Sequence, residues 1–194
     1  TMKHIKYLLF LSILCSLVLF NACSEDEDPA GIIIGSSYQG GIIAYLFQEG
    51  DAGYLAGKVH GLIAATEDQT TEDGAVWCYL SEISGADGIA IGTGAQNTLD
   101  ILAGCSENKI AAKLAADYEV TVDGITYDDW FLPSKDELNK LYLNKDAVGG
   151  FANNYYWSST VFDYYIAWKQ NFLNGFQNDY GKDGALRVRS VRAF

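Results

Sequence analysis

Residues 130–142, WFLPSKDELNKLY, carry the clearest structural signal in the chain. Ser134 and Glu137 have the spacing of a capping box, in which the two residues satisfy each other's free backbone amides at the start of a helix. The apolar positions that follow recur on one helix face: Leu138, Leu141 and Tyr142. The stretch therefore predicts an amphipathic helix with a structural role, and we assign it no chemistry.

The sequence after this helix predicts antiparallel strands. Beyond Gly150 the chain is rich in aromatic residues, asparagine and glycine, and apolar and polar residues alternate over 166–172. Turn residues at 173–175 and 180–184 separate the alternating runs. We expect the last strand, over 186–192, to lie in the centre of its sheet.

The region before residue 130 predicts short strands and short helices. Glycine-flanked apolar runs at 41–47 and 61–65 are typical of buried strands, whereas the spacing over 96–104 and 110–118 is helical. Residues 120–124 predict a strand that enters a tight turn. Short helices followed by antiparallel strands give an α+β fold class.

The N-terminus has the features of a lipoprotein signal peptide over residues 1–22. Lys3 and Lys6 precede a mainly apolar run of 13 residues, 8–20. As a helix this run spans about 20 Å, which is less than the hydrocarbon core of about 30 Å, so we predict an export signal and not a membrane span. The Ala22-Cys23 pair resembles a bacterial lipobox, in which the cysteine is lipidated at its thiol. An ordinary secretory signal is the alternative.

Residues 23–37 are predicted to be a lipidated cysteine and an acidic tether. The tether carries four adjacent carboxylates over 25–28 and should stay solvated. It is similar to the export tag that Bacteroidetes lipoproteins carry after the lipidated cysteine. We therefore expect a lipoprotein of the bacterial outer membrane that faces the cell exterior and contacts the membrane through its anchor alone.

Residues 38–194 are expected to form one domain. Without residues 1–22 the chain has 11 basic and 25 acidic residues, a net charge of −14. Such a charge repels nucleic acid, so we expect no nucleic-acid partner.

Two cysteines, Cys78 and Cys105, remain when Cys15 leaves with the signal and Cys23 is lipidated. An oxidising location favours a disulfide between them, and two separate buried thiols are the alternative. A catalytic thiol is disfavoured because His60 is the single histidine outside the signal.

Six stretches, in this order, carry a resemblance to a known family: GGIIAYLFQEGDAGYL (40–55), HGLIAATEDQ (60–69), WFLPSKDELNKLY (130–142), GGFANNYYWSST (149–160), AWKQNFLNG (167–175) and VRSVRAF (188–194). Together they resemble the C-terminal domain of the Legionella collagen-like protein, a family related to the Fibrobacter major paralogous domain. The resemblance implies a C-type lectin-like fold, with short helices packed on a twisted antiparallel sheet and long irregular loops. Because family members include surface adhesins, it also implies a non-catalytic recognition or adhesion module.

The expected ligand is a carbohydrate, or else a surface protein of a host or neighbouring cell. Tyrosine, asparagine and glycine are concentrated over 153–184. Aromatic rings pack on the apolar faces of sugars, and amides pair with hydroxyl groups. The predicted ligand-binding residues are Tyr164, Tyr165, Asn174, Gln177, Asn178, Asp179 and Tyr180. The alternative is that about half of these tyrosines belong to the core.

We predict neither a metal nor a cofactor. The Glu-Pro-Asn, Gln-Pro-Asp and Trp-Asn-Asp tripeptides of calcium-dependent lectins do not occur in this sequence. Five aspartates can still ligate calcium through oxygen, although solvated loop acids are the favoured interpretation: Asp123, Asp128, Asp129, Asp179 and Asp183. Sulfated polysaccharides would require a basic patch made of Lys182, Arg187, Arg189 and Arg192.

Two other functions remain as alternatives. One is a structural subunit of a cell-surface or pilus assembly. The other is an oxidase, because the formylglycine-generating oxidases share a lectin-like scaffold and bind copper through two cysteines. Cys78 and Cys105 are the candidates for that chemistry, but no supporting motif surrounds them. We therefore predict no catalytic residues and a protein that is not an enzyme.

Overall fold

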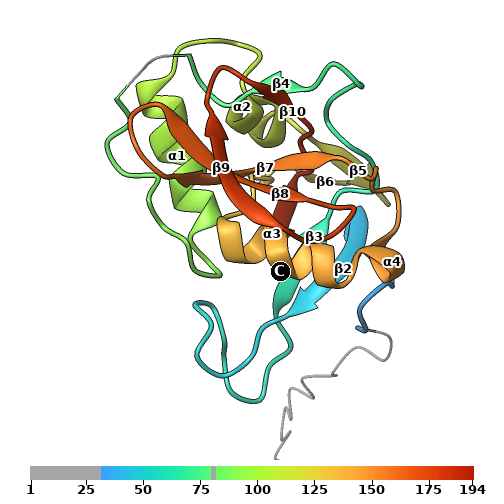
Figure 1. Cartoon of the computed structure of the whole chain (residues 1–194). Coiled ribbons are helices and arrows are strands. Elements are labelled where there is room, and N and C mark those ends of the chain that lie inside the picture. The colour runs from blue at the N-terminus through green and yellow to red at the C-terminus, as the bar shows by residue number, and fades with distance from the viewer. Residues whose placement is uncertain (1–31, 80–81) are drawn as a thin grey trace, which may run out of the picture.

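The computed structural model describes residues 32–79 and 82–194 and has a mixed α+β architecture (Figure 1). Short helices pack against several open antiparallel sheets. The predicted signal peptide, the lipidation site Cys23 and the acidic residues of the tether lie outside the described residues. Within the described residues, no helix is long and apolar enough to cross a membrane.

The first sheet contains strands from both ends of the described part of the chain. Its antiparallel strands lie in the order β1 (Ser37–Tyr38), β2 (Gly41–Leu46), β3 (Gly61–Ala64) and β11 (Val191–Ala193). Gln39 and Gly40 form the turn between β1 and β2, and both have positive φ angles. A two-residue turn of this hand matches the twist of the two strands that it joins. Because β11 pairs with β3, the C-terminus of the chain lies beside its first strands.

The second sheet is a three-stranded meander in the order β7 (Tyr155–Val161), β8 (Ile166–Asn171) and β9 (Gln177–Gly181). Helix α3 (Lys135–Leu143) lies against one of its faces (Figure 1). The Lys135 ammonium lies 3.8 Å from the centroid of the Trp168 ring, and the Gln177 amide donates to the Lys135 carbonyl. Strand β9 is at the edge of this sheet.

The predicted capping box is confirmed at the start of α3. The Ser134 hydroxyl accepts from the Glu137 amide, and the Glu137 carboxylate accepts from the Ser134 amide at 2.7 Å. The helix ends at Leu143, and a short helix, α4 (Lys145–Val148), follows Asn144.

Two small sheets and two helices complete the domain. Strand β4 (Ala75–Val76) pairs with β10 (Ala185–Leu186), β5 (Val120–Val122) pairs with β6 (Ile125–Tyr127), and the helices are α1 (Gly94–Gly104) and α2 (Ala111–Ala116). Asp123 and Gly124 form the tight turn between β5 and β6 with φ angles of 52° and 81°. This Asp-Gly turn is the one that the sequence predicts.

The prediction of one central strand over 186–192 is wrong. The chain instead leaves β10 at Leu186 and forms β11 from Val191, in a different sheet and at its edge. Between them the Arg187 backbone bonds to β7, while the Ser190 carbonyl accepts from Ala65 beside β3. Residues 187–190 therefore bond first to β7 and then to Ala65 beside β3. They do not form one continuous strand within a single sheet.

Several residues of the six stretches that carry the resemblance lie in the core, among them Trp130, Leu132, Pro133, Trp157, Phe172, Val188 and Val191. Trp77 and Trp157 are both fully buried, and each indole N–H donates to a backbone carbonyl, of Ser158 and of Ala75 respectively. Trp168 is half-buried instead, beneath the Lys135 ammonium.

Candidate functional site

Two predicted ligand-binding residues, Tyr164 and Tyr165, lie together in the turn between β7 and β8. Their side chains are 43% and 62% exposed, and their ring centroids lie 4.6 Å apart in an edge-on arrangement. The Asp163 carboxylate accepts from the amides of Tyr165 and Ile166 at 2.8 and 3.0 Å. These bonds fix the turn and therefore position the two exposed rings.

A cavity of about 300 Å³ opens beside this turn. Its lining residues are Glu82, Ile83, Gly85, Asp87, Val161, Asp163, Tyr164 and Lys182. Three of these residues carry carboxylates and one carries an ammonium group. We call this cavity, together with Tyr165 at its side, the tyrosine cleft.

The ammonium group of the tyrosine cleft belongs to a buried lysine. Lys182 is 1% exposed, and its Nζ donates to the Tyr164 carbonyl at 3.0 Å and lies 4.9 Å from the centroid of the Trp77 ring. Burial lowers the pKa of Lys182, an effect that the nearby Asp163 carboxylate opposes. Lys182 thus links the backbone of the tyrosine turn to the buried core.

Tyr180 and Asp179 lie on the exposed edge strand β9. The Tyr180 ring is 44% exposed and stacks at an angle on Trp157, with 6.1 Å between centroids. The Lys169 ammonium lies 3.9 Å from the ring centroids of both Tyr155 and Tyr180. Burial lowers the pKa of Lys169. Tyr180 therefore combines an exposed surface with a structural contact to the core.

Asp179 and Tyr180 do not line the tyrosine cleft, and the structure does not bring the other three predicted residues to it either. Asn174 lies in the turn at the opposite end of the β8–β9 hairpin, where its side-chain oxygen Oδ1 accepts from the Phe176 backbone amide. The Gln177 amide donates to Lys135 and helps to hold α3. Asn178 is half-buried, and its side-chain amide donates to the neighbouring Asp179 carbonyl. These contacts belong to the fold.

Sequence reasoning missed three polar residues of the tyrosine cleft, Glu82, Asp87 and Asp163, and considered Lys182 for a sulfated ligand only. An aspartate directly before two tyrosines, between two alternating runs, is typical of a side-chain-bonded turn and was a usable signal for Asp163. Glu82 and Asp87 come from the long segment before α1, and no local pattern links them to residues 163–165.

The four basic residues considered for a sulfated ligand do not form an exposed patch. Arg187 and Arg189 both pair with Asp68, at 3.1 and 2.7 Å, and Arg192 pairs with Asp129 at 2.6 Å. Arg189, Arg192 and Lys182 are buried. The three arginines form ion pairs within the fold, and the Lys182 ammonium donates to a backbone carbonyl, so none of the four is available as part of an exposed basic patch.

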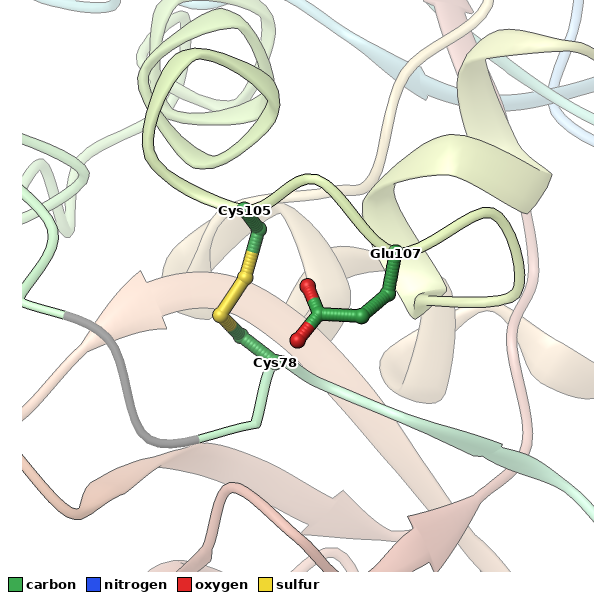
Figure 2. A group of neighbouring side chains, drawn as sticks. All are labelled: Cys78, Cys105 and Glu107. Atoms are coloured by element: carbon green, nitrogen blue, oxygen red, sulfur yellow. A yellow bond between two sulfur atoms is a disulfide. The ribbon is translucent and has the colours of Figure 1, made fainter.

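Cys78 and Cys105 are joined by a disulfide, with 6.1 Å between their Cα atoms (Figure 2). The bond closes a loop with a sequence separation of 27 residues, which stabilises the fold by about 3 to 4 kcal/mol in the chain-entropy model. The Glu107 carboxylate points toward the two sulfur atoms (Figure 2). Ligand atoms of these three residues all lie within 4.8 Å of one another.

Over residues 32–79 and 82–194, this is the one group of histidine, cysteine or acidic side chains close enough to share a metal ion. The five aspartates considered for calcium do not gather in this way.

Comparison with known proteins gives no family for the chain. No family model matches it, and no curated protein matches it either.

Proposed function

We propose that the protein is a non-catalytic recognition module that binds carbohydrate in the tyrosine cleft. The observation that carries this proposal is the exposed Tyr164–Tyr165 pair beside a cavity lined by carboxylates. These aromatic rings are already exposed in a fixed turn. They can therefore contact a ligand without any rearrangement of the core.

The polar groups of the tyrosine cleft suit hydroxyl groups. Carboxylates accept hydrogen bonds at two oxygens each, so Glu82, Asp87 and Asp163 can pair with neighbouring hydroxyls of one sugar ring. A volume of about 300 Å³ is at the lower limit for ligand pockets, which suits one sugar ring or the end of a chain. Three carboxylates against one ammonium group favour neutral or amino sugars over sulfated ones.

A C-type lectin-like fold is part of the same proposal. It is supported by short helices on antiparallel sheets, by the pairing of β11 with β3, and by long segments without regular structure, such as 47–60. The six stretches that resemble the Legionella collagen-like protein family give it a sequence basis. The tyrosine cleft lies between the turn from β7 to β8 and the irregular segment that precedes α1.

The proposal places the module on the outer face of a bacterial outer membrane, anchored through a lipid on Cys23. The apolar run before Cys23 and the acids after it support this location. The disulfide supports export as well, because disulfides persist in oxidising compartments.

Replacing Tyr165 with alanine is expected to weaken glycan binding by about tenfold or more, since stacking of an aromatic ring contributes roughly 1 kcal/mol beyond the area that it buries. Stability should not change, because Tyr165 is largely exposed. The measurement is a glycan array with the full mature chain, followed by titration calorimetry with the best glycan.

The control for this prediction is Tyr54→Ala. Tyr54 is also exposed, but it lies in the loop 47–60, which extends away from the sheets (Figure 1). Glycan binding should be unchanged in this variant. Silence across the array, or equal affinities for Tyr165→Ala and the unmodified protein, would contradict the carbohydrate proposal.

A further inference from the structure

We propose that Cys78, Cys105 and Glu107 form a binding site for a zinc-like divalent cation when the disulfide is reduced. This inference is independent of the tyrosine cleft and of any glycan. It differs from the sequence-based prediction of no metal, which did not consider Glu107.

The first observation is the position of the Glu107 carboxylate. It points toward the two sulfur atoms, two residues after Cys105 on the same loop (Figure 2). Its Oε2 atom is buried and has no hydrogen-bond partner among residues 32–79 and 82–194. A buried carboxylate oxygen without a partner is costly, and a cation is one of the few groups that can compensate for it.

The second observation is the spacing of the three ligand atoms. They lie within 4.8 Å of one another. Two ligand bonds of about 2.0 to 2.3 Å, the usual zinc–oxygen and zinc–sulfur lengths, together span a little over 4 Å. One ion can therefore contact all three residues after small side-chain rotations.

The chemistry of the three ligands selects the metal. Two thiolates and one carboxylate suit zinc, or cobalt and cadmium as its substitutes, and do not suit calcium or magnesium, which prefer oxygen. Three protein ligands leave a fourth tetrahedral position for water. The three negative charges also repel one another in a partly buried place, so a divalent cation stabilises them together.

The disulfide must open before the cation binds. A dithiol reductant supplies two electrons and two protons, so that the S–S bond breaks, two thiols form, and the reductant leaves as a cyclic disulfide. The cation then displaces the two thiol protons. The resulting bridge joins the same two points of the chain as the disulfide, and it therefore restores the crosslink in a different form.

The test uses the full mature chain, reduced with dithiothreitol and freed from it under anaerobic conditions. We expect one cobalt ion to bind per chain, with a thiolate-to-metal charge-transfer band, and zinc to displace it. The oxidised protein should bind neither ion. Cys105→Ser should lose the charge-transfer band.

Glu107→Gln distinguishes the proposed site from two reduced cysteines alone. This variant should bind zinc at least about tenfold more weakly, because even the loss of a group that only orients a metal ligand commonly weakens binding by that factor. The matched control is Glu119→Gln, at an exposed position just after α2, and it should bind as the unmodified chain does.

Two results would overturn the proposal. One is a reduced chain that fails to bind zinc in a one-to-one ratio. The other is equal zinc affinity in Glu107→Gln and Glu119→Gln, which would mean that the cysteines bind without the carboxylate, as they would in an unfolded chain.

Discussion

Replacing Asp68 with alanine is expected to lower the free energy of unfolding by about 4 kcal/mol, because removal of one partner from a buried ion pair typically costs 3 to 5 kcal/mol. The Asp68 carboxylate accepts from Arg189 Nε at 2.9 Å, from Arg187 at 3.1 Å and from the Tyr156 hydroxyl at 2.9 Å. Arg189 and Tyr156 are fully buried. The substitution leaves their polar groups without this partner and without water.

Urea denaturation of the oxidised protein checks this prediction, with Asp117→Ala as the control. Asp117 also forms an ion pair, with Lys113, but the Lys113 and Asp117 side chains are 38% and 55% exposed. Exposed pairs of this type contribute about 0.5 kcal/mol or less. We call the contacts of Asp68 with Arg187, Arg189 and Tyr156 the Asp68 network. Similar losses of stability in the two variants would contradict a large contribution of this network to the free energy of unfolding.

The Asp68 network also explains why the end of the chain differs from its prediction. Alternation over 186–192 places Arg187 and Arg189 on the same side, and both do reach Asp68. Arg189 further donates to the carbonyls of Ala65 and Gly150, which lie in two different parts of the chain. These contacts fix the segment between two sheets. Sequence alone could not show this, because Asp68 is about 120 residues away along the chain.

Features that depend on neighbouring residues were predictable from sequence. The capping box at Ser134 and Glu137 and the Asp123-Gly124 turn both occur where the sequence places them. Each is decided within a few residues, by hydrogen bonds or by backbone φ preferences that distant contacts rarely override. The buried strands β2 and β3 also follow from their continuous apolar runs.

The candidate site was predictable only in part. Composition points to the aromatic region, but it does not separate the fully buried Tyr156 from the exposed Tyr165, since both occur in Tyr-Tyr pairs. The arrangement of the strands in the sheets decides which tyrosine is buried and which is exposed. The carboxylates of Glu82 and Asp87 reach the tyrosine cleft through tertiary packing, so no local signal identifies them.

Glu137 joins the starts of two helices. Its carboxylate accepts from the Ser134 amide at the start of α3 and from the Gly92 amide before α1, at 2.7 and 2.8 Å, and also from the Gly94 amide. The side chain is fully buried. Burial raises the pKa of Glu137 to about 7, and this effect is larger than that of the amide donors, which lower it.

Because the pKa of Glu137 is higher in the folded protein than in the unfolded chain, the folded state takes up a proton first as the pH falls. The stabilisation from this proton is complete below about pH 4.5 and is lost as the pH rises through about 7. We therefore expect Glu137 to add about 2 to 3 kcal/mol to the free energy of unfolding when the pH falls from about 8.5 to 5.

Urea denaturation across this pH range, on the unmodified chain and on Glu137→Gln, measures the contribution of Glu137. Glutamine does not titrate, and contributions from all other groups are common to both proteins, so the difference between the two curves isolates this residue. The gap should widen in favour of the unmodified protein as the pH falls. Parallel curves would mean that the amide donors hold the carboxylate ionised throughout, and that the junction between α1 and α3 does not respond to pH.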